Sequence, residues 1–269
     1  GMPPLTARYN ALYWAARHGH ANIVSLLLDD RRSDANLVFK RWMRHFTAFA
    51  VAVFEGHEDV TQLMLRHDLV DVNLPLPNGN GYWGLNSTAL HLAAVQGHAT
   101  IIEMFLQEKL KNQDKIDLNP VDGQGWTPFH RAVERGQVNA VRVFLSFPTL
   151  VDINRITDSF QDSPLHTACD GEWVSKYGEE QELHLLKHRV EMIRVLLENT
   201  NIITKGINHD GNTPLLFCLT GHSKCCGRKV YEPDLAASMG LEFLKRGVGA
   251  KVSEWFAELQ WDVRVYLYI

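Results

Sequence analysis

The stretch Ser87–Asn119 decides the fold of this chain. It reads Thr88-Ala-Leu-His-Leu-Ala-Ala-Val-Gln-Gly97-His98, then Ile101-Ile-Glu-Met-Phe-Leu106, and it ends Ile116-Asp-Leu-Asn119. Two short apolar runs with helical spacing are separated by a glycine, and an Asp-x-Asn sequence follows them. A helix pair of this size cannot bury its apolar side chains alone, so we expect it to be one unit of a repeat array.

The same order of features recurs along the whole chain. Each unit begins with Thr, Ser or Asn, and the six starting residues are Asn10, Thr47, Thr88, Thr127, Ser163 and Thr213. In the first four units the starting residue stands nine positions before the glycine that follows the first apolar run. This fixed register predicts a helix pair in every unit.

The residue types at these positions fit two short helices for physical reasons. Thr or Ser before an apolar run is a favoured N-cap, because its hydroxyl accepts a hydrogen bond from an orphan backbone N–H. Pro128, Pro164 and Pro214 come next and fit the first helical position, which needs no N–H. The glycine then supplies the left-handed residue that ends the first helix.

The chain resembles the ankyrin-repeat family, whose unit has about 33 residues and a Thr-Pro-Leu-His-x-Ala signature. The resemblance is strongest at Thr127-Pro-Phe-His-Arg-Ala132 and Ser163-Pro-Leu-His-Thr-Ala168, and it is weakest in the first and sixth units. It implies an all-α fold, an α-solenoid of about six stacked ankyrin-type helix-turn-helix repeats with hairpin loops.

The array is expected to span residues 5–250. Its units lie near 10–46, 47–87, 88–126, 127–162, 163–212 and 213–250. Residues 251–269 are rich in apolar side chains, and we expect them to cap the last unit or to meet a further part of a longer protein. The 172–188 insertion is either a partner-specific loop or, as we prefer, a solvated helical extension, and a second insertion occupies 223–233.

Composition narrows the classes of function. A net charge of −4 gives no broad basic field, so we expect no nucleic-acid partner. No apolar run approaches the roughly 20 residues of a membrane helix, and the first residues lack the pattern of a signal peptide. Four cysteines do not form a disulfide framework, and Cys218 takes a small-residue core position. These features favour an intracellular location, cytoplasmic or nuclear.

Histidines and cysteines raise an alternative function. His91, His130 and His166 hold one position in three units, and in the ankyrin family this histidine links hairpins by hydrogen bonds. His222, Cys225 and Cys226 are the one cluster with the residue types of a metal or catalytic site, although adjacent cysteines are awkward for chelation. Because no nucleophile or phosphate-binding motif accompanies them, we expect no enzyme, no metal and no cofactor.

The resemblance implies a protein–protein interaction module, an adaptor or scaffold, that binds an unknown partner protein through its concave face and hairpin tips. No small-molecule substrate or membrane contact is expected. Two groups of positions are candidates: residues near the end of each first helix, and aromatic residues near the hairpin tips. They are Arg17, Phe54, Val95, Gln96, Arg131, Glu134 and Arg135, and Tyr82, Trp83, Trp126 and Phe160. Trp83, Trp126, Arg131 and Arg135 are the expected anchors, since exposed aromatic and Arg side chains dominate interface energy; packing of Trp126 on a neighbouring hairpin stays equally open.

Overall fold

The computed structural model describes residues 11–30, 34–41, 44–77, 85–169, 179–220 and 233–247. The chain divides into two compact units. Unit 1 contains residues 1–153 and 157–159, and unit 2 contains residues 154–156 and 160–269.

The described residues of both units are built mainly from helices arranged in consecutive pairs. In unit 1 the helices are α1 (Ala11–Arg17), α2 (Ala21–Asp29), α3 (Ala48–Glu55), α4 (Glu58–Arg66), α5 (Ala89–Gln96), α6 (Ala99–Lys111), α7 (Pro128–Glu134) and α8 (Val138–Leu145). In unit 2 they are α9 (Pro164–Cys169), α10 (Glu179–Glu198), α11 (Pro214–Thr220) and α12 (Pro233–Lys245). The predicted all-α architecture is confirmed, whereas the count of six ankyrin units stays a prediction.

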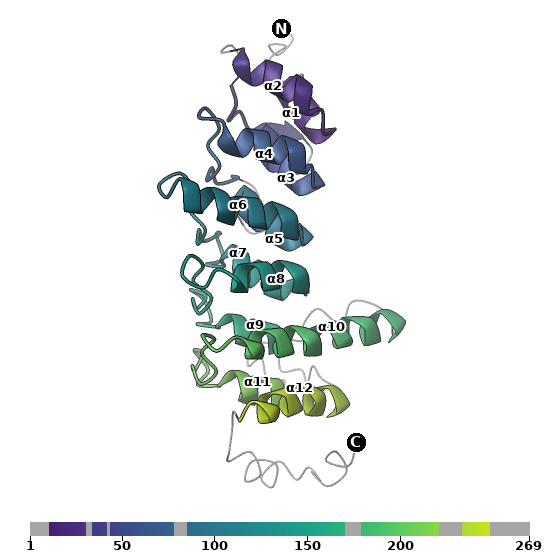
Figure 1. Ribbon diagram of the computed structural model, residues 1–269. Coiled ribbons are helices and arrows are strands. Elements are labelled where there is room, and N and C mark those ends of the chain that lie inside the picture. Colours follow the sequence, from purple (N-terminus) through teal and green to yellow (C-terminus); the bar gives the residue numbers. More distant parts are fainter. Residues whose placement is uncertain are drawn as a thin grey trace. The chain divides into compact units, whose positions relative to one another are not determined.

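Unit 1 consists of two layers of helices (Figure 1). The first helices α1, α3, α5 and α7 contact their neighbours in one layer, and the second helices α2, α4, α6 and α8 do so in the other. Aromatic rings fill the space between the layers, with Phe49 near Phe105 and Phe129 near Phe144, each pair at 5.8 Å between ring centroids. Stacking therefore buries the apolar stripe that one helix pair cannot bury alone.

The predicted capping residues begin the first helices. The Thr47 hydroxyl accepts the Ala50 N–H at 3.0 Å, and the Thr127 hydroxyl accepts the His130 N–H at 3.3 Å. α7, α9 and α11 each begin at a proline, as the sequence predicts. These caps fix where each first helix starts.

A two-stranded hairpin lies between the first two helix pairs, where the sequence analysis assigned no element. β1 (Phe39–Arg41) pairs antiparallel with β2 (Arg44–Phe46), so that Phe39 faces Phe46. Phe39 packs on Tyr13 at 4.5 Å between ring centroids, and Phe46 is buried. The strands form here because aromatic side chains at the hairpin base join the core of unit 1.

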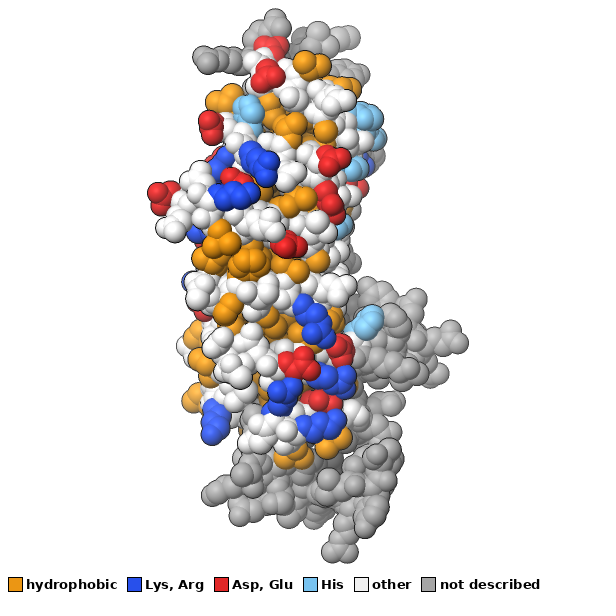
Figure 2. Space-filling view, in the orientation of Figure 1, with side chains coloured by type: hydrophobic (Ala, Val, Ile, Leu, Met, Phe, Trp, Pro, Cys, Tyr) orange, Lys and Arg blue, Asp and Glu red, His pale blue; other side chains and the backbone are white. Residues whose placement is uncertain are grey.

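Unit 2 repeats the same pairing of helices. α9 contacts α11, α10 contacts α12, and each first helix contacts its own second helix. Acidic and basic side chains gather over α10 and α12 in Figure 2. Among them, Glu242 lies 3.2 Å from Arg194 and 3.0 Å from Lys245, so ion pairs cross between the two second helices.

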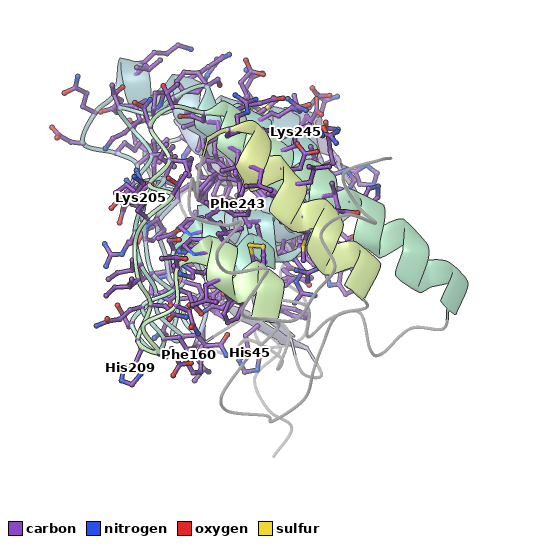
Figure 3. The ribbon with its side chains drawn as sticks, turned by 90° about the horizontal axis from the view of Figure 1, so that it is seen from below. His45, Phe160, Lys205, His209, Phe243 and Lys245 are labelled. Atoms are coloured by element: carbon purple, nitrogen blue, oxygen red, sulfur yellow. A yellow bond between two sulfur atoms is a disulfide. The ribbon has the colours of Figure 1, made fainter. Side chains whose placement is uncertain are left out.

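Four cysteines were expected not to form a disulfide framework, yet one disulfide is present among the described residues. Cys169 at the end of α9 is bonded to Cys218 in α11 (the yellow bond in Figure 3). Cys218 is fully buried, as expected for a small core residue. The pairing could not be read from the sequence because the two residues are 49 positions apart.

Candidate functional site

The end of each first helix in unit 1 is tied to the following helix pair. His57 Nε2 donates to the Arg17 carbonyl at 2.8 Å, His98 Nε2 to the Phe54 carbonyl at 3.1 Å, and Gln137 Nε2 to the Val95 carbonyl at 2.9 Å. These three bonds, here called the carbonyl ladder, occupy equivalent positions in successive units. The histidines that follow Gly56 and Gly97, which are His57 and His98, therefore have a structural role.

The glycine that follows each of the first three first helices is required by this ladder. Gly56 has φ +83°, a left-handed conformation that L side chains rarely adopt, and a Cβ there would lie 2.9 Å from the His98 ring. A Cβ on Gly97 would likewise collide with the side chain of Gln137. The glycine therefore both turns the chain and lets the next unit approach.

Three predicted contact residues supply the carbonyls of this ladder. Phe54 and Val95 are buried, which corrects the expectation that their side chains meet a partner. Arg17 is half-buried, with its guanidinium 5.6 Å from the Trp14 ring and 3.7 Å from the Glu55 carboxylate. The side chains of Phe54 and Val95 are therefore part of the core between stacked helix pairs and not of the surface.

The surface lies one residue further along the chain. His18, Glu55 and Gln96 are exposed and Arg135 is half-buried. These four residues, each directly before the helix-ending glycine, are called the first-helix row. The sequence signal for the row is the combination of fixed position with a side chain that differs in every unit.

Arg131, an expected anchor, is instead a core residue. Its side chain is 4% exposed and donates to Asp122 Oδ2 from Nε at 2.8 Å and from Nη2 at 2.5 Å. Glu134 Oε2 accepts from Nη1 at 3.0 Å, and Gln124 Oε1 accepts from Nη2 at 2.5 Å. Because a buried guanidinium needs such acceptors, the expectation that Arg131 faces a partner is wrong.

Trp126 and Glu134 belong to the same cluster. The Arg131 guanidinium carbon lies 4.7 Å from the centroid of the half-buried Trp126 ring, so the indole covers the ion pair. Glu134 Oε2 also lies 3.7 Å from Arg135 Nε, which connects the cluster to the first-helix row. The structure thus brings Trp126, Arg131, Glu134 and Arg135 together.

The remaining expected contacts divide between described and undescribed residues. Phe160 is exposed near a hairpin tip of unit 2. Tyr82 and Trp83 lie outside the described residues, as do His222, Cys225 and Cys226 and the 251–269 segment.

Two of the repeated histidines, His91 and His166, have the hydrogen bonds expected of fold-specifying residues. His91 Nδ1 accepts the Thr88 N–H at 3.1 Å, so its proton is on Nε2, which donates to the Trp126 carbonyl at 2.9 Å. His166 makes the same pair of bonds to Ser163 and Asn212. Burial lowers the pKa of His91 to about 4 and also lowers the pKa of His166, so both rings stay neutral.

A second ladder was not assigned from the sequence. Three asparagines of unit 1 each donate to a carbonyl of the following repeat and accept a backbone N–H from that repeat. They are Asn36, Asn73 and Asn119. For Asn73 these bonds measure 2.9 Å to the Lys115 carbonyl and 3.0 Å from the Asp117 N–H. The recurring Asp-x-Asn exit was the signal that could have revealed it.

Two further findings concern metal-ligand groups and membrane-spanning helices in the part of the chain that the structure describes. There, no three His, Cys, Asp or Glu side chains are grouped as metal ligands. None of the helices in the described ranges is both long and apolar enough to cross a membrane.

Comparisons with known proteins bear on this geometry. A family model described as ankyrin repeats (3 copies) matches residues 4–75, 68–155 and 90–177. The human (Homo sapiens) transient receptor potential cation channel subfamily A member 1 is 31% identical over 140 residues, which are 50% of this chain and 10% of the channel. The chain therefore spans about a tenth of the length of that relative.

A solved structure shares the fold. The crystal structure of EF0377, an ankyrin repeat protein, superposes with a TM-score of 0.59 at 17% sequence identity, covering 87% of this chain and 96% of that chain. Family-model matches span more than half of the sequence, and the helix pairs, caps and ladders agree with them. The chain belongs to the ankyrin-repeat family.

Proposed function

We propose that this chain is a protein–protein interaction module, an adaptor or scaffold, that binds its partner protein along the first-helix row of unit 1. Ankyrin repeats are in general modules that bind other proteins. The observation that carries the proposal is the row His18, Glu55, Gln96 and Arg135, which places side chains of different chemistry at one repeated position of the fold.

The contrast with neighbouring positions supports a binding role. In each of the four repeats of unit 1, the residue two places before the first-helix row is small or apolar and is buried. These residues are Ala16, Val53, Ala94 and Val133. Packing therefore dictates the residue type there, whereas the row position carries a different polar side chain in each repeat, although Gln96 Nε2 also donates to the Phe54 carbonyl at 3.5 Å. A surface position that accepts such variation is where recognition chemistry can be built.

The chemistry of the row fits a polar partner surface with charges of both signs. Glu55 carries a negative charge beside Arg17, and Arg135 carries a positive charge beside Glu134. Because each charge has a neighbour of opposite sign, the row offers hydrogen bonds and local charge pairs rather than a strong field of one sign. Trp126, whose half-buried ring lies over the Arg131 guanidinium, adds an apolar surface to the cluster that contains Arg135.

Affinity capture tests this placement. The triple variant Glu55→Lys, Gln96→Lys and Arg135→Ala changes the row in α3, α5 and at the end of α7. Loss of at least tenfold in recovery of the partner from extracts of the source organism is expected, because interface charges are reversed or removed. Quantitative mass spectrometry of the captured proteins, with unchanged far-UV circular dichroism, gives the measurement.

A matched control lies on the second helices. Glu103→Lys, Gln62→Lys and Lys111→Ala makes the same charge changes at exposed residues of α4 and α6. This variant should recover the partner as the wild type does. Equal loss in both variants, or loss in the control alone, would move the binding surface away from the first-helix row.

A further inference from the structure

The disulfide of unit 2 joins two adjacent helix pairs at equivalent ends. Cys169 is the last residue of α9, Cys218 lies near the end of α11, and their Cα atoms are 5.0 Å apart. Both side chains are fully buried. The bond therefore crosses the contact between the two first helices inside the core of unit 2.

The fold does not need this bond in order to pack. Counting from the start of each unit, the position of Cys218 holds Ala52, Ala93 and Ala132 in unit 1, all of which are fully buried. The position of Cys169 holds Val53, Ala94 and Val133, which are also buried. Because a reduced cysteine is itself a small apolar side chain, it fits these positions as Ala and Val do.

The location of the bond gives it a specific consequence. In unit 1 the ends of the first helices are tied to the next pair by the carbonyl ladder, through His98 and Gln137. In unit 2 a covalent link stands at the same end of the helices. Cys169 directly precedes the long segment between α9 and α10, and Cys218 lies just before the segment between α11 and α12. The bond thus holds together the two points from which these segments leave.

We propose that Cys169 and Cys218 form a reversible redox latch that locks the two helix pairs of unit 2 when oxidised and releases them when reduced. The reductant is a small monothiol of the glutathione class. One thiolate attacks a sulfur of the bond, forming a mixed disulfide and releasing the other cysteine as a thiolate. A second thiol then attacks the mixed disulfide, so that two protein thiols and one small-molecule disulfide result.

Burial sets how the latch operates. Since neither cysteine is exposed, the attacking thiol reaches the bond only when α9 and α11 separate locally. Reduction is therefore slow in the folded protein. Once reduced, unit 2 loses the constraint on its unfolded chain, and its unfolding equilibrium constant rises about 10²- to 10³-fold, as expected for a closed loop of this length.

Peptide mapping of the full chain tests the latch. The protein is equilibrated in glutathione buffers from reduced to oxidised, alkylated in denaturant and digested. Peptides that contain Cys169 and Cys218 should change together from alkylated to linked as the buffer becomes oxidising, and back again. Alkylation of these two peptides that stays the same from the reduced to the oxidised buffer would overturn the proposal.

Hydrogen exchange then locates the effect. In the wild type, α9 and α11 should exchange about 10²- to 10³-fold faster after reduction, whereas α3 and α5 should not change. The variant Cys169→Ala with Cys218→Ala should exchange at one rate in both buffers. The control Cys225→Ser with Cys226→Ser should keep the wild-type response. A redox response that persists in the first variant, or is lost in the second, assigns the switch to other cysteines and overturns the proposal.

Discussion

Arg131 and Asp122 form a buried ion pair at a position where earlier units have apolar side chains. The residues equivalent to Arg131 are Val51 and Leu92, and both are buried. Asp122 also accepts the backbone N–H groups of Gln124 and Trp126, at 2.9 Å and 3.1 Å, so it shapes the hairpin turn as well. One carboxylate therefore serves the turn and the guanidinium together.

The residue equivalent to Asp122 in unit 2 suggests a substitution that separates the turn hydrogen bonds of Asp122 from its ion pair with Arg131. Asn208 occupies the position of Asp122 in unit 2 and accepts the N–H groups of Asp210 and Asn212, at 3.1 Å and 3.0 Å. Asp122→Asn should therefore keep the turn but remove the charge facing Arg131. We expect it to lower the free energy of unfolding by about 2–3 kcal/mol, because a buried cation loses its main partner. Urea denaturation gives the value.

A double variant distinguishes the lost ion pair from other damage. Asp122→Asn combined with Arg131→Leu removes both charges and restores the leucine found at position 92. Most of the lost stability should return, since an apolar pair of similar volume often replaces a buried ion pair without cost. A double variant less stable than Asp122→Asn would show that Arg131 stabilises the unit by some route other than this pair.

His91 makes unit 1 sensitive to acid. Its pKa falls from 6.5 in the unfolded chain to about 4 in the folded protein because of burial. Between these values the unfolded chain binds the proton and the folded protein does not, so stability is full above pH 6.5 and is lost as the pH falls toward 4. From pH 7.5 to pH 5 the loss from this one residue is about 2 kcal/mol.

Urea denaturation at the two pH values measures this loss. The variant His91→Gln retains a hydrogen-bonding side chain but does not titrate, so its unfolding free energy should depend on pH less than that of the wild type by about 2 kcal/mol. An unchanged dependence would mean that the acid sensitivity comes from other groups.

At the scale of the helix, the carbonyl ladder links elements that local sequence cannot link. His98 and Gln137 hold the same position in consecutive units and make the same bond to the preceding first helix. The fold therefore requires a hydrogen-bond donor of suitable length at this position, and either histidine or glutamine can supply it. A structural role therefore accounts for His98 at this position.

A pair of substitutions tests that account of the element. His98→Gln should leave the free energy of unfolding within about 0.5 kcal/mol of the wild type, because Gln can donate to the Phe54 carbonyl as Gln137 does to that of Val95. His98→Ala should cost about 1 kcal/mol, since the carbonyl loses a donor. Thermal and urea unfolding measure both. Equal stability of the two variants would show that the bond contributes nothing to the stack.

At the scale of the whole molecule, both units link successive helix pairs by asparagine side chains, as from Asn154 to Asn201 in unit 2. Among the described residues, the carbonyl ladder is added in unit 1 and the disulfide in unit 2. Because stability in repeat arrays is largely a sum of contacts between neighbours, a change within one unit acts chiefly on that unit. The redox response should therefore be local to unit 2, whereas the part of the acid response that comes from His91 should be local to unit 1.

The set of residues expected to contact a partner is the prediction that the tertiary structure changed most. Phe54 and Val95 stand near the end of their helices in sequence, and their carbonyls and burial became clear only with the following unit in place. Gln96, one residue further, is exposed. A shift of one residue along a helix turns a side chain by about 100°, so small errors of register exchange core for surface.

The sequence by itself determined the helix pairs, their caps, the turning glycines and the family, because these depend on residue types at short, fixed spacings. Only the tertiary structure decided that Arg131 is buried with Asp122, that Cys169 is bonded to Cys218, and which end residues face solvent. Burial and pairing depend on side chains that the neighbouring repeat supplies, from tens of residues away in the chain. No sequence pattern within one repeat contains that information.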